Sequence, residues 1–132
     1  MLDGRWNTVG HAVTYCATSP PLCVLEKLVH VQDPDLLPEL VMVRYHVPDA
    51  LGMETINVAQ LPFGWQRQES LTQARGDAWH QALTAPLLRV PSAIVPLEDA
   101  PDMNVIINHR HPAVREIAVA ATERFVLDSR LI

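Results

Sequence analysis

The first half of the chain alternates between strand-like and helix-like patterns. Residues 11–17 (HAVTYCA) alternate in polarity and are rich in β-forming residues, which predicts a strand. Residues 19–21 (SPP) are typical of a helix N-cap followed by proline in the first turn, and the apolar spacing after them predicts a helix as far as Val31. The sequence DPD at 33–35 ends this helix, and residues 40–47 (LVMVRYHV) predict a second strand.

The second half of the chain has a less regular pattern. Residues 70–84 predict a helix despite the interior Gly76, residues 61–67 (LPFGWQR) predict a loop, and residues 114–121 fit a helix or a strand equally well. Strands or strand pieces are expected at residues 53–58, 87–90, 93–95 and 125–127, and a further short apolar run follows an acidic turn at 103–107. Short strands with two clear helices predict a single compact α+β domain over residues 1–132 rather than the βαβ alternation of a Rossmann domain.

The composition is that of an ordinary globular domain. The chain has 132 residues, is 48% hydrophobic and carries a net charge of −5. A chain of this size is one domain and can bury a hydrophobic core without disulfide bonds or metal ions. Its start lacks the layout of a signal peptide, and it has no run of roughly 20 apolar residues, so we expect no membrane span. The acidic balance argues against a nucleic-acid surface. Cys16 and Cys23 cannot make a disulfide scaffold, which predicts the reducing cytoplasm as the location.

Familiar nucleotide, hydrolase and metalloprotease fingerprints are absent from the sequence. None of GxGxxG, GxxxxGK[ST], GxSxG and HExxH occurs. His109 and His111 could chelate a metal from a strand, but no third ligand stands near them in sequence, and zinc sites normally use three or four protein ligands. A polar loop that hydrogen-bonds backbone groups is the preferred interpretation, so no metal site is predicted.

Glu26 is the most informative acid in the chain. It lies in the middle of the predicted helix beside an apolar stripe, where a carboxylate is partly desolvated and costs stability unless it is paired or used. The alternative is an exposed glutamate that pairs with His30 on the solvent face. Ser92, which follows a proline between two predicted strand pieces, would ordinarily be a turn residue.

A second candidate group precedes the first predicted strand. Arg5, Trp6 and Asn7 lie between two glycines, in a loop that can bring an arginine to a phosphate while the tryptophan offers a stacking face. Nine of the ten cations are arginine, the type suited to bidentate phosphate contacts. The alternatives are a surface arginine beside a core-filling Trp6 and, for Tyr15 in the strand, a core aromatic.

The order and spacing of these features resemble the RES domain, a family named for its Arg, Glu and Ser. The matching segments are GRWNTVGHAVTYCATSPPLCVLEKLVHV at 4–31, LLRVPSAIVP at 87–96, NVIINHRHP at 104–112 and FVLDSRLI at 125–132. The first segment is the most specific, and together the four cover nearly the whole chain.

The resemblance implies a fold and a chemistry that periodicity does not show. RES proteins are toxins of bacterial toxin–antitoxin pairs, and their fold is similar to that of ADP-ribosyltransferases, with a mixed β-core and flanking helices. They cleave the nicotinamide–ribose bond of NAD⁺, as hydrolases, as phosphorylases or as protein ADP-ribosyltransferases. The resemblance therefore implies NAD⁺ as substrate without a metal, a cognate antitoxin with an Xre-like helix-turn-helix part, a protein acceptor in the transferase case, and an oligomer formed with the antitoxin.

The resemblance also assigns roles to individual residues. The implied catalytic residues are Glu26, Arg5, Tyr15 and Ser92. Glu26 would stabilise positive charge on the ribose or hold a ribose hydroxyl, and Arg5 would clamp the diphosphate. Tyr15 would stack on nicotinamide, and Ser92 would hydrogen-bond the ribose or Glu26. The residues implied to contact NAD⁺ are Arg5, Trp6, Asn7, Tyr15, Ser92 and Asn108.

Two positions depart from the family pattern. Family members usually have a strand and a further stretch before the GRWN motif, whereas Met1 stands only three residues ahead of Gly4. We expect either a short variant, with this strand short or missing, or a start that lies upstream. His109 stands where the pattern leads us to expect proline. The short start motivates an alternative function, a catalytically weak RES-fold module that mainly engages an antitoxin.

Overall fold

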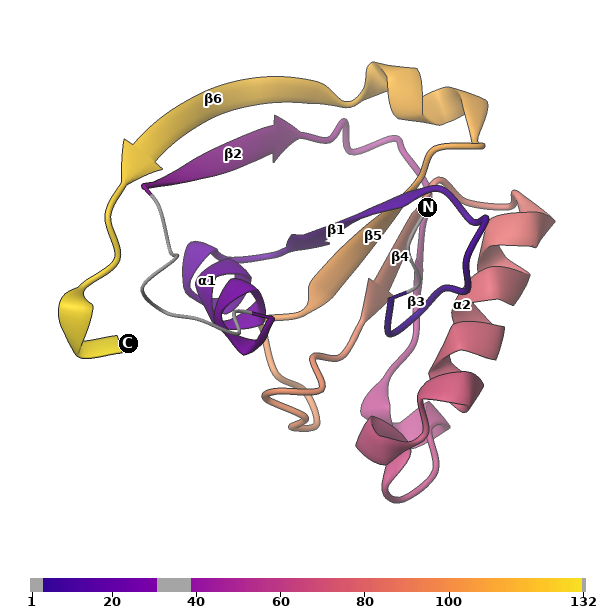
Figure 1. The fold of residues 1–132 in the computed structure, drawn as a ribbon. Coiled ribbons are helices and arrows are strands. Elements are labelled where there is room, and N and C mark those ends of the chain that lie inside the picture. The colour runs from indigo at the N-terminus through magenta and orange to yellow at the C-terminus, as the bar shows by residue number, and fades with distance from the viewer. Residues whose placement is uncertain (1–3, 31–38, 132) are drawn as a thin grey trace.

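The computed structural model describes residues 4–30 and 39–131, and Figure 1 shows its elements. The strands are β1 Val13–Ala17, β2 Leu40–His46, β3 Met53–Thr55, β4 Leu87–Val90, β5 Asn104–Asn108 and β6 Ala118–Phe125. The α-helices are α1 Pro20–Val29 and α2 Glu69–Ala82. Neither helix in the described ranges is long and apolar enough to cross a bilayer.

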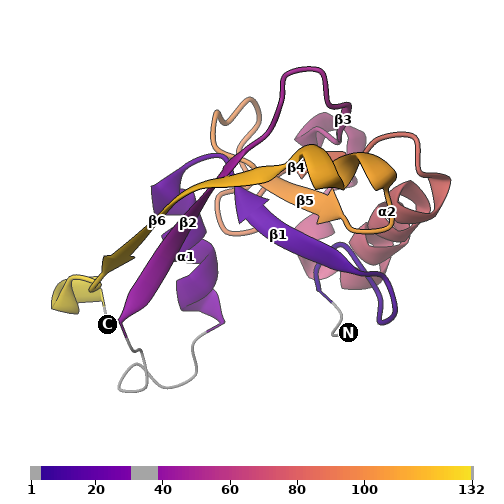
Figure 2. The same cartoon turned by 90° about the horizontal axis from the view of Figure 1, so that it is seen from above.

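The strands form a four-stranded sheet and a separate two-stranded sheet. In the larger sheet the order is β1-β5-β4-β3, with β5 antiparallel to both neighbours and β3 parallel to β4. The smaller sheet pairs β2 with β6 and lies above α1 and β1 in Figure 1, and Figure 2 shows the same arrangement from above. Helices α1 and α2 lie at opposite sides of the larger sheet. This arrangement confirms the predicted α+β fold with a mixed β-core and flanking helices.

Helix α1 begins where the sequence predicts. The Ser19 hydroxyl accepts a hydrogen bond from the Leu22 amide at 3.4 Å, and prolines occupy the first helical positions, where no intrahelical N–H donor is needed. The helix ends at Val29, and Val31 and the DPD sequence at 33–35 lie outside the described residues.

The segment after Gly4 is docked along α2 by polar contacts. Gln73 donates to the Gly4 carbonyl at 2.9 Å, and Asp77 accepts from the backbone amide and the hydroxyl of Thr8 at 3.0 and 2.6 Å. A β-carbon at Gly76 would collide with the backbone carbonyl of Trp6, so the glycine allows the segment to lie against the helix. Helix α2 thereby fixes the N-terminal loop in space.

The hydrophobic core lies between the larger sheet and α2. Its buried members are Trp6, Ile56, Trp65, Trp79, Leu88, Val90 and Ile106. Trp79 also donates its indole N–H to the Ala85 carbonyl at 3.0 Å, which satisfies the polar end of a buried ring. Because Val90 and Ile106 belong to β4 and β5, the core packs against the strands that lead to the candidate site.

The structure corrects several predicted elements. Residues 93–95 are not a strand, because the Ser92 hydroxyl accepts from the amides of Ile94 and Val95 and turns the chain. Residues 125–127 are not a separate strand either, since Phe125 ends β6. The ambiguous region 114–121 resolves into a 3₁₀ helix, Pro112–Glu116, followed by β6.

Two further boundaries differ from the prediction. Strand β3 stops at Thr55, and residues after it form a 3₁₀ turn, Val58–Gln60. The predicted loop at 61–67 contains a second 3₁₀ turn, Trp65–Arg67, whose first residue is buried in the core. Short 3₁₀ turns leave little periodic signal, which explains why the sequence did not predict them.

Candidate functional site

The carboxylate of Glu26 is held by two side chains from different parts of the sheet. Its Oε1 atom accepts a hydrogen bond from the Ser92 hydroxyl at 2.9 Å and another from Asn104 Nδ2 at 2.8 Å. Ser92 follows β4, Asn104 begins β5, and Glu26 lies on α1. We call these three residues the carboxylate cluster. The alternative in which Glu26 is a solvated side chain paired with His30 is therefore wrong.

Ser92 has no hydrogen-bonding capacity left for a ligand. Ser92 is only 1% exposed. Its hydroxyl donates a hydrogen bond to Glu26 and accepts from the amides of Ile94 and Val95 at 3.1 and 3.3 Å. A hydroxyl has one donor and two acceptor sites, and all three are used. Of the two predicted contacts of Ser92, the structure contains the one to Glu26.

A second group, the loop cluster, is formed by Arg5, Trp6, Asn7 and Tyr15. The Tyr15 hydroxyl donates to Asn7 Oδ1 at 2.5 Å and accepts from the backbone amide of Trp6 at 3.0 Å. Burial raises the pKa of Tyr15 to about 12, so the phenol keeps its proton at neutral pH. Tyr15 is nevertheless 42% exposed, which leaves part of its ring accessible.

Gly4 is the position that makes this contact possible. A β-carbon at Gly4 would lie 2.5 Å from the Tyr15 hydroxyl oxygen and 2.7 Å from Asn7 Oδ1. Such distances are far below van der Waals contact, so a larger residue would displace the phenol. The glycine before the Arg-Trp-Asn motif is thus required by packing.

Arg5 is partly buried and has one fixed hydrogen bond. Its Nη1 donates to the Gln66 carbonyl at 2.9 Å, and its own carbonyl accepts from Thr72. Within residues 4–30 and 39–131, no carboxylate lies within salt-bridge distance of its guanidinium. The unpaired positive charge and the remaining N–H donors are the chemistry that binds a phosphate.

The sheet register relates the two clusters. Tyr15 is directly opposite Ile106, and Asn104 is opposite Ala17, so Tyr15 and Asn104 project from the same face of the β1–β5 pair. They are diagonal neighbours, for which a separation of roughly 7–8 Å is typical. The larger sheet therefore places the loop cluster and the carboxylate cluster beside each other.

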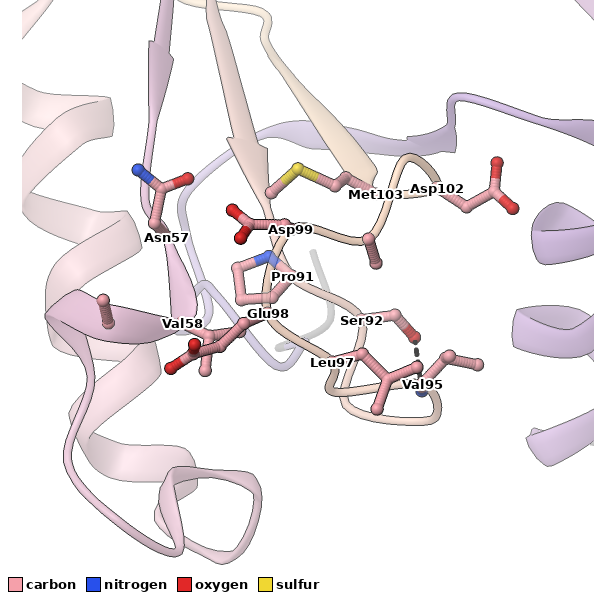
Figure 3. A pocket seen from close by; sticks show the side chains of 12 residues that line it. Asn57, Val58, Pro91, Ser92, Val95, Leu97, Glu98, Asp99, Asp102 and Met103 are labelled. Atoms are coloured by element: carbon pink, nitrogen blue, oxygen red, sulfur yellow. Dashed lines mark hydrogen bonds between the residues drawn. The ribbon is translucent and has the colours of Figure 1, made fainter.

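A cavity of about 200 Å³ adjoins Ser92, as Figure 3 shows. Its wall is formed by the segments that follow β3 and β4, the second of which leads to β5, with Asn57, Pro91, Val95 and Met103 among the lining residues. Glu98, Asp99 and Asp102 also line it. Glu26 does not line this cavity, so the cavity reaches the carboxylate cluster only at Ser92.

Two of the residues expected to contact NAD⁺ are core residues in the structure. Trp6 is 2% exposed, and its ring packs on Trp65 with the centroids 6.1 Å apart, so it offers no free stacking face. Asn108 is fully buried at the far end of β5, where it donates to the His80 carbonyl at 2.9 Å and accepts from the Arg110 amide. Although the register also makes Asn108 a diagonal neighbour of Tyr15, its side-chain hydrogen bonds go to residues outside both clusters.

Asn104 is the site residue that sequence reasoning missed. The sequence around Asn104 does not indicate a function for it. Its place in the site follows only from its hydrogen bond to Glu26, which is distant in the chain. Asn7 is also buried and holds the Tyr15 hydroxyl.

His109, His111 and the two cysteines have ordinary structural surroundings. His109 contacts the Thr14 hydroxyl at 2.6 Å, and His111 Nδ1 accepts from the Ala113 amide at the start of a 3₁₀ helix. In the part of the chain that the structure describes, no group of three or more His, Cys, Asp or Glu is placed to hold a metal ion. Burial raises the pKa of the Cys16 thiol to about 11 and also raises that of Cys23, so both thiols are protonated at neutral pH.

Comparison with known proteins identifies the family. The model of the RES domain family matches residues 2–128. A protein named Toxin Res from Pseudomonas putida is 39% identical, with 98% of this chain and 86% of the relative covered. The Prs ADP-ribosylating toxin of Sphingobium sp. is 35% identical over 100% of this chain and 82% of its own length, and a Toxin Res from Photorhabdus laumondii is 32% identical over 100% and 83%. These matches confirm the resemblance inferred from the motifs, and the chain belongs to the RES domain family.

Proposed function

We propose that this protein is a RES-type toxin that consumes NAD⁺ by cleaving its nicotinamide–ribose bond. The observation that carries the proposal is the Glu26 carboxylate, oriented by Ser92 and Asn104 beside a loop that presents Arg5. The names of the relatives support it, because ADP-ribosylation takes its ADP-ribose from NAD⁺ and one relative is an ADP-ribosylating toxin.

The chemistry fits a fixed carboxylate. As the bond between the ribose C1′ and the pyridinium nitrogen breaks, its electron pair leaves with nicotinamide and positive charge develops on the ribose, as in glycoside hydrolysis. Glu26 would stabilise that charge or accept a hydrogen bond from a ribose hydroxyl. An acceptor oxygen or nitrogen then bonds to C1′ and gives its proton to Glu26 or to water. Nicotinamide leaves as a neutral molecule, so the leaving group needs no general acid.

The loop cluster would bind the remainder of NAD⁺. Arg5 would contact the diphosphate through the N–H groups that Gln66 does not use, and the exposed part of the Tyr15 ring would stack on nicotinamide. Trp6 and Asn7 would contribute indirectly, since both are buried and one of them holds the Tyr15 hydroxyl.

The experiment is a measurement of nicotinamide release from NAD⁺ by the purified chain, in buffers with and without phosphate. Release without phosphate indicates hydrolysis, and release that requires phosphate indicates phosphorolysis. A labelled protein in a bacterial extract supplied with labelled NAD⁺ indicates ADP-ribosyl transfer. Binding of NAD⁺ without release of nicotinamide under all three conditions would instead favour the catalytically weak binding module.

The proposal includes a neutralising partner in the bacterial cytoplasm. The relatives named as toxins support an antitoxin, and the RES resemblance points to one with an Xre-like helix-turn-helix part that assembles with the toxin into an oligomer. Expression of the chain should then arrest bacterial growth, and co-expression of the cognate antitoxin should restore it. The variant Glu26→Gln should not arrest growth, which separates toxicity by catalysis from toxicity by overexpression.

A further inference from the structure

We propose that Asn104 is a positioning residue that, together with Ser92, fixes the Glu26 carboxylate through one oxygen and leaves the other oxygen for the substrate. The inference rests on the proposed function, because it concerns how the same carboxylate meets the ribose of NAD⁺. It adds a residue to the site and changes the role of Ser92 from a ligand contact to a support.

The two hydrogen bonds converge on a single atom. Ser92 Oγ and Asn104 Nδ2 both donate to Glu26 Oε1, at 2.9 and 2.8 Å. A carboxylate oxygen has two lone pairs, so these donors occupy Oε1. No described residue donates a hydrogen bond to Oε2, which is therefore the oxygen available to a ribose hydroxyl or an acceptor.

One donor, Asn104, begins strand β5, and the other, Ser92, lies just after the end of the adjacent strand β4. Asn104 is paired with Val90 in the β4–β5 ladder and with Ala17 in the β1–β5 ladder, and Ser92 follows Val90 by two residues. Ser92 is held in turn by the amides of Ile94 and Val95. A donor mounted on a central strand holds its partner more tightly than one on a free loop. The sheet therefore sets the rotation of the carboxylate on α1.

Ser92 acts on the substrate only through Glu26, since its hydroxyl has no free donor or acceptor. Asn104 differs because one N–H bonds Glu26 while its second N–H and its Oδ1 have no hydrogen bond to any described residue. Its contact with Oε1 is charge-assisted, the stronger class of hydrogen bond. Losing this contact should allow the carboxylate to rotate.

The test compares steady-state nicotinamide release by the wild type with that of Asn104→Ala, Asn104→Asp and Ser92→Ala. We expect kcat of Asn104→Ala to fall about 10- to 100-fold, in line with the loss of a charge-assisted hydrogen bond, while KM for NAD⁺ stays nearly constant. kcat of Asn104→Asp should fall at least as far, because the aspartate has the same size but replaces the N–H donor with a like charge. In a Glu26→Gln background, Asn104→Ala should have no further effect on the residual rate.

Thr18→Val is the matched control. Thr18 contacts the segment directly before Asn104, donating to the Pro101 carbonyl and accepting from the Met103 amide, but it does not touch Glu26. If Asn104 merely held this segment in place, Thr18→Val would lower kcat as much as Asn104→Ala does. If the positioning role is correct, Thr18→Val leaves kcat unchanged.

The outcomes separate the two proposals. If the wild type is active and folded Asn104→Ala has an unchanged kcat, the positioning role alone is overturned. Absence of nicotinamide release by the folded wild-type chain without phosphate, with phosphate and in the bacterial extract would overturn the proposed function and the positioning role with it. If Asn104→Ala does not fold, the isosteric Asn104→Asp decides, and its wild-type kinetics would overturn the inference.

Discussion

The backbone carbonyl of Trp6 lies directly against Gly76 in the middle of α2. Glycine in a helix interior is normally a weakness of roughly 0.5–1 kcal/mol relative to alanine. Here the missing side chain lets the N-terminal loop approach the helix, where Gln73 and Asp77 bind it. The same loop carries Arg5 and supports the Tyr15 hydroxyl, so this contact connects a helix glycine to the candidate site.

Gly76→Ala should therefore destabilise the protein, although the same change stabilises an ordinary helix. We expect the free energy of unfolding to fall by about 1–3 kcal/mol or more, because the new methyl group overpacks the Trp6 backbone. Urea unfolding followed by circular dichroism measures it, with Ser70→Ala at an exposed position of α2 as the control. A Gly76→Ala variant as stable as the wild type would show that the loop does not rest on α2.

Tyr15→Phe should destabilise the loop cluster. The change removes the acceptor of the Trp6 amide and the donor to Asn7, and taking a hydrogen-bond partner from a buried residue typically costs about 1–3 kcal/mol of unfolding free energy. Tyr45→Phe on β2 is the control, since Tyr45 is exposed to a similar extent but its hydroxyl makes no hydrogen bond to a described residue. Equal stabilities of the two variants would contradict the structural role of the Tyr15 hydroxyl.

The raised pKa of Tyr15 predicts a loss of stability at alkaline pH. Because the pKa is about 12 in the folded protein and lies near 10 in an unfolded chain, the stabilisation is complete below about pH 10 and is lost as the pH rises from there toward 12. The decline in unfolding free energy over this range should be smaller in Tyr15→Phe than in the wild type. If the unfolding free energy declined equally with pH in both proteins, folding would not raise the pKa of Tyr15.

Arg5→Lys should impair NAD⁺ binding more than the chemical step. Lysine keeps the charge but lacks the planar fork that contacts two phosphate oxygens together, so we expect KM for NAD⁺ to rise about tenfold with a smaller change in kcat. Steady-state kinetics of Arg5→Lys measure this, with Arg67→Lys on the exposed surface as the control. A selective fall in kcat would place Arg5 at the reacting bond instead of at the diphosphate.

His80 should make the fold sensitive to mild acid. Burial lowers its pKa, opposed by a hydrogen bond to the Ala12 carbonyl and reinforced by His11 and Arg110, while Asp77 raises it. The unfolded chain then binds more protons below about pH 6.5, so the stabilisation is present above that pH and is lost as the pH falls toward the folded value. Unfolding free energies at pH 7.5 and 5.5 should differ less in His80→Gln than in the wild type.

Local signals were sufficient for the elements that depend on local interactions. The Ser19 cap, the following prolines and the alternation of residues 11–17 correctly predicted α1 and β1. Residues 93–95 were misread because hydrogen bonds to Ser92, and not the apolar run, decide their conformation. The helix at residues 70–84 was correctly predicted despite Gly76, but only the contact of this glycine with Trp6, 70 residues earlier in the chain, explains why a glycine stands there.

The candidate site also contains residues that the sequence could indicate and residues that only distant contacts reveal. The motifs indicated Glu26, Ser92, Arg5 and Tyr15, and the structure places these in two neighbouring clusters. Motif position could not distinguish a side chain that faces a ligand from one that supports the site, as Trp6 and Asn7 show. Asn104 becomes visible only when strand register and helix packing bring it to Glu26.

The most direct test of the central claim is nicotinamide release from NAD⁺ by the wild type and by Glu26→Gln, with Glu116→Gln at an exposed position as the control. Glu26→Gln keeps the size of the side chain but removes its negative charge. We expect release by Glu26→Gln to fall at least about 100-fold, the scale on which lost electrostatic stabilisation of a transition state is measured, with Glu116→Gln unchanged. Release by folded Glu26→Gln at the wild-type rate would contradict the assignment of Glu26 as the catalytic carboxylate.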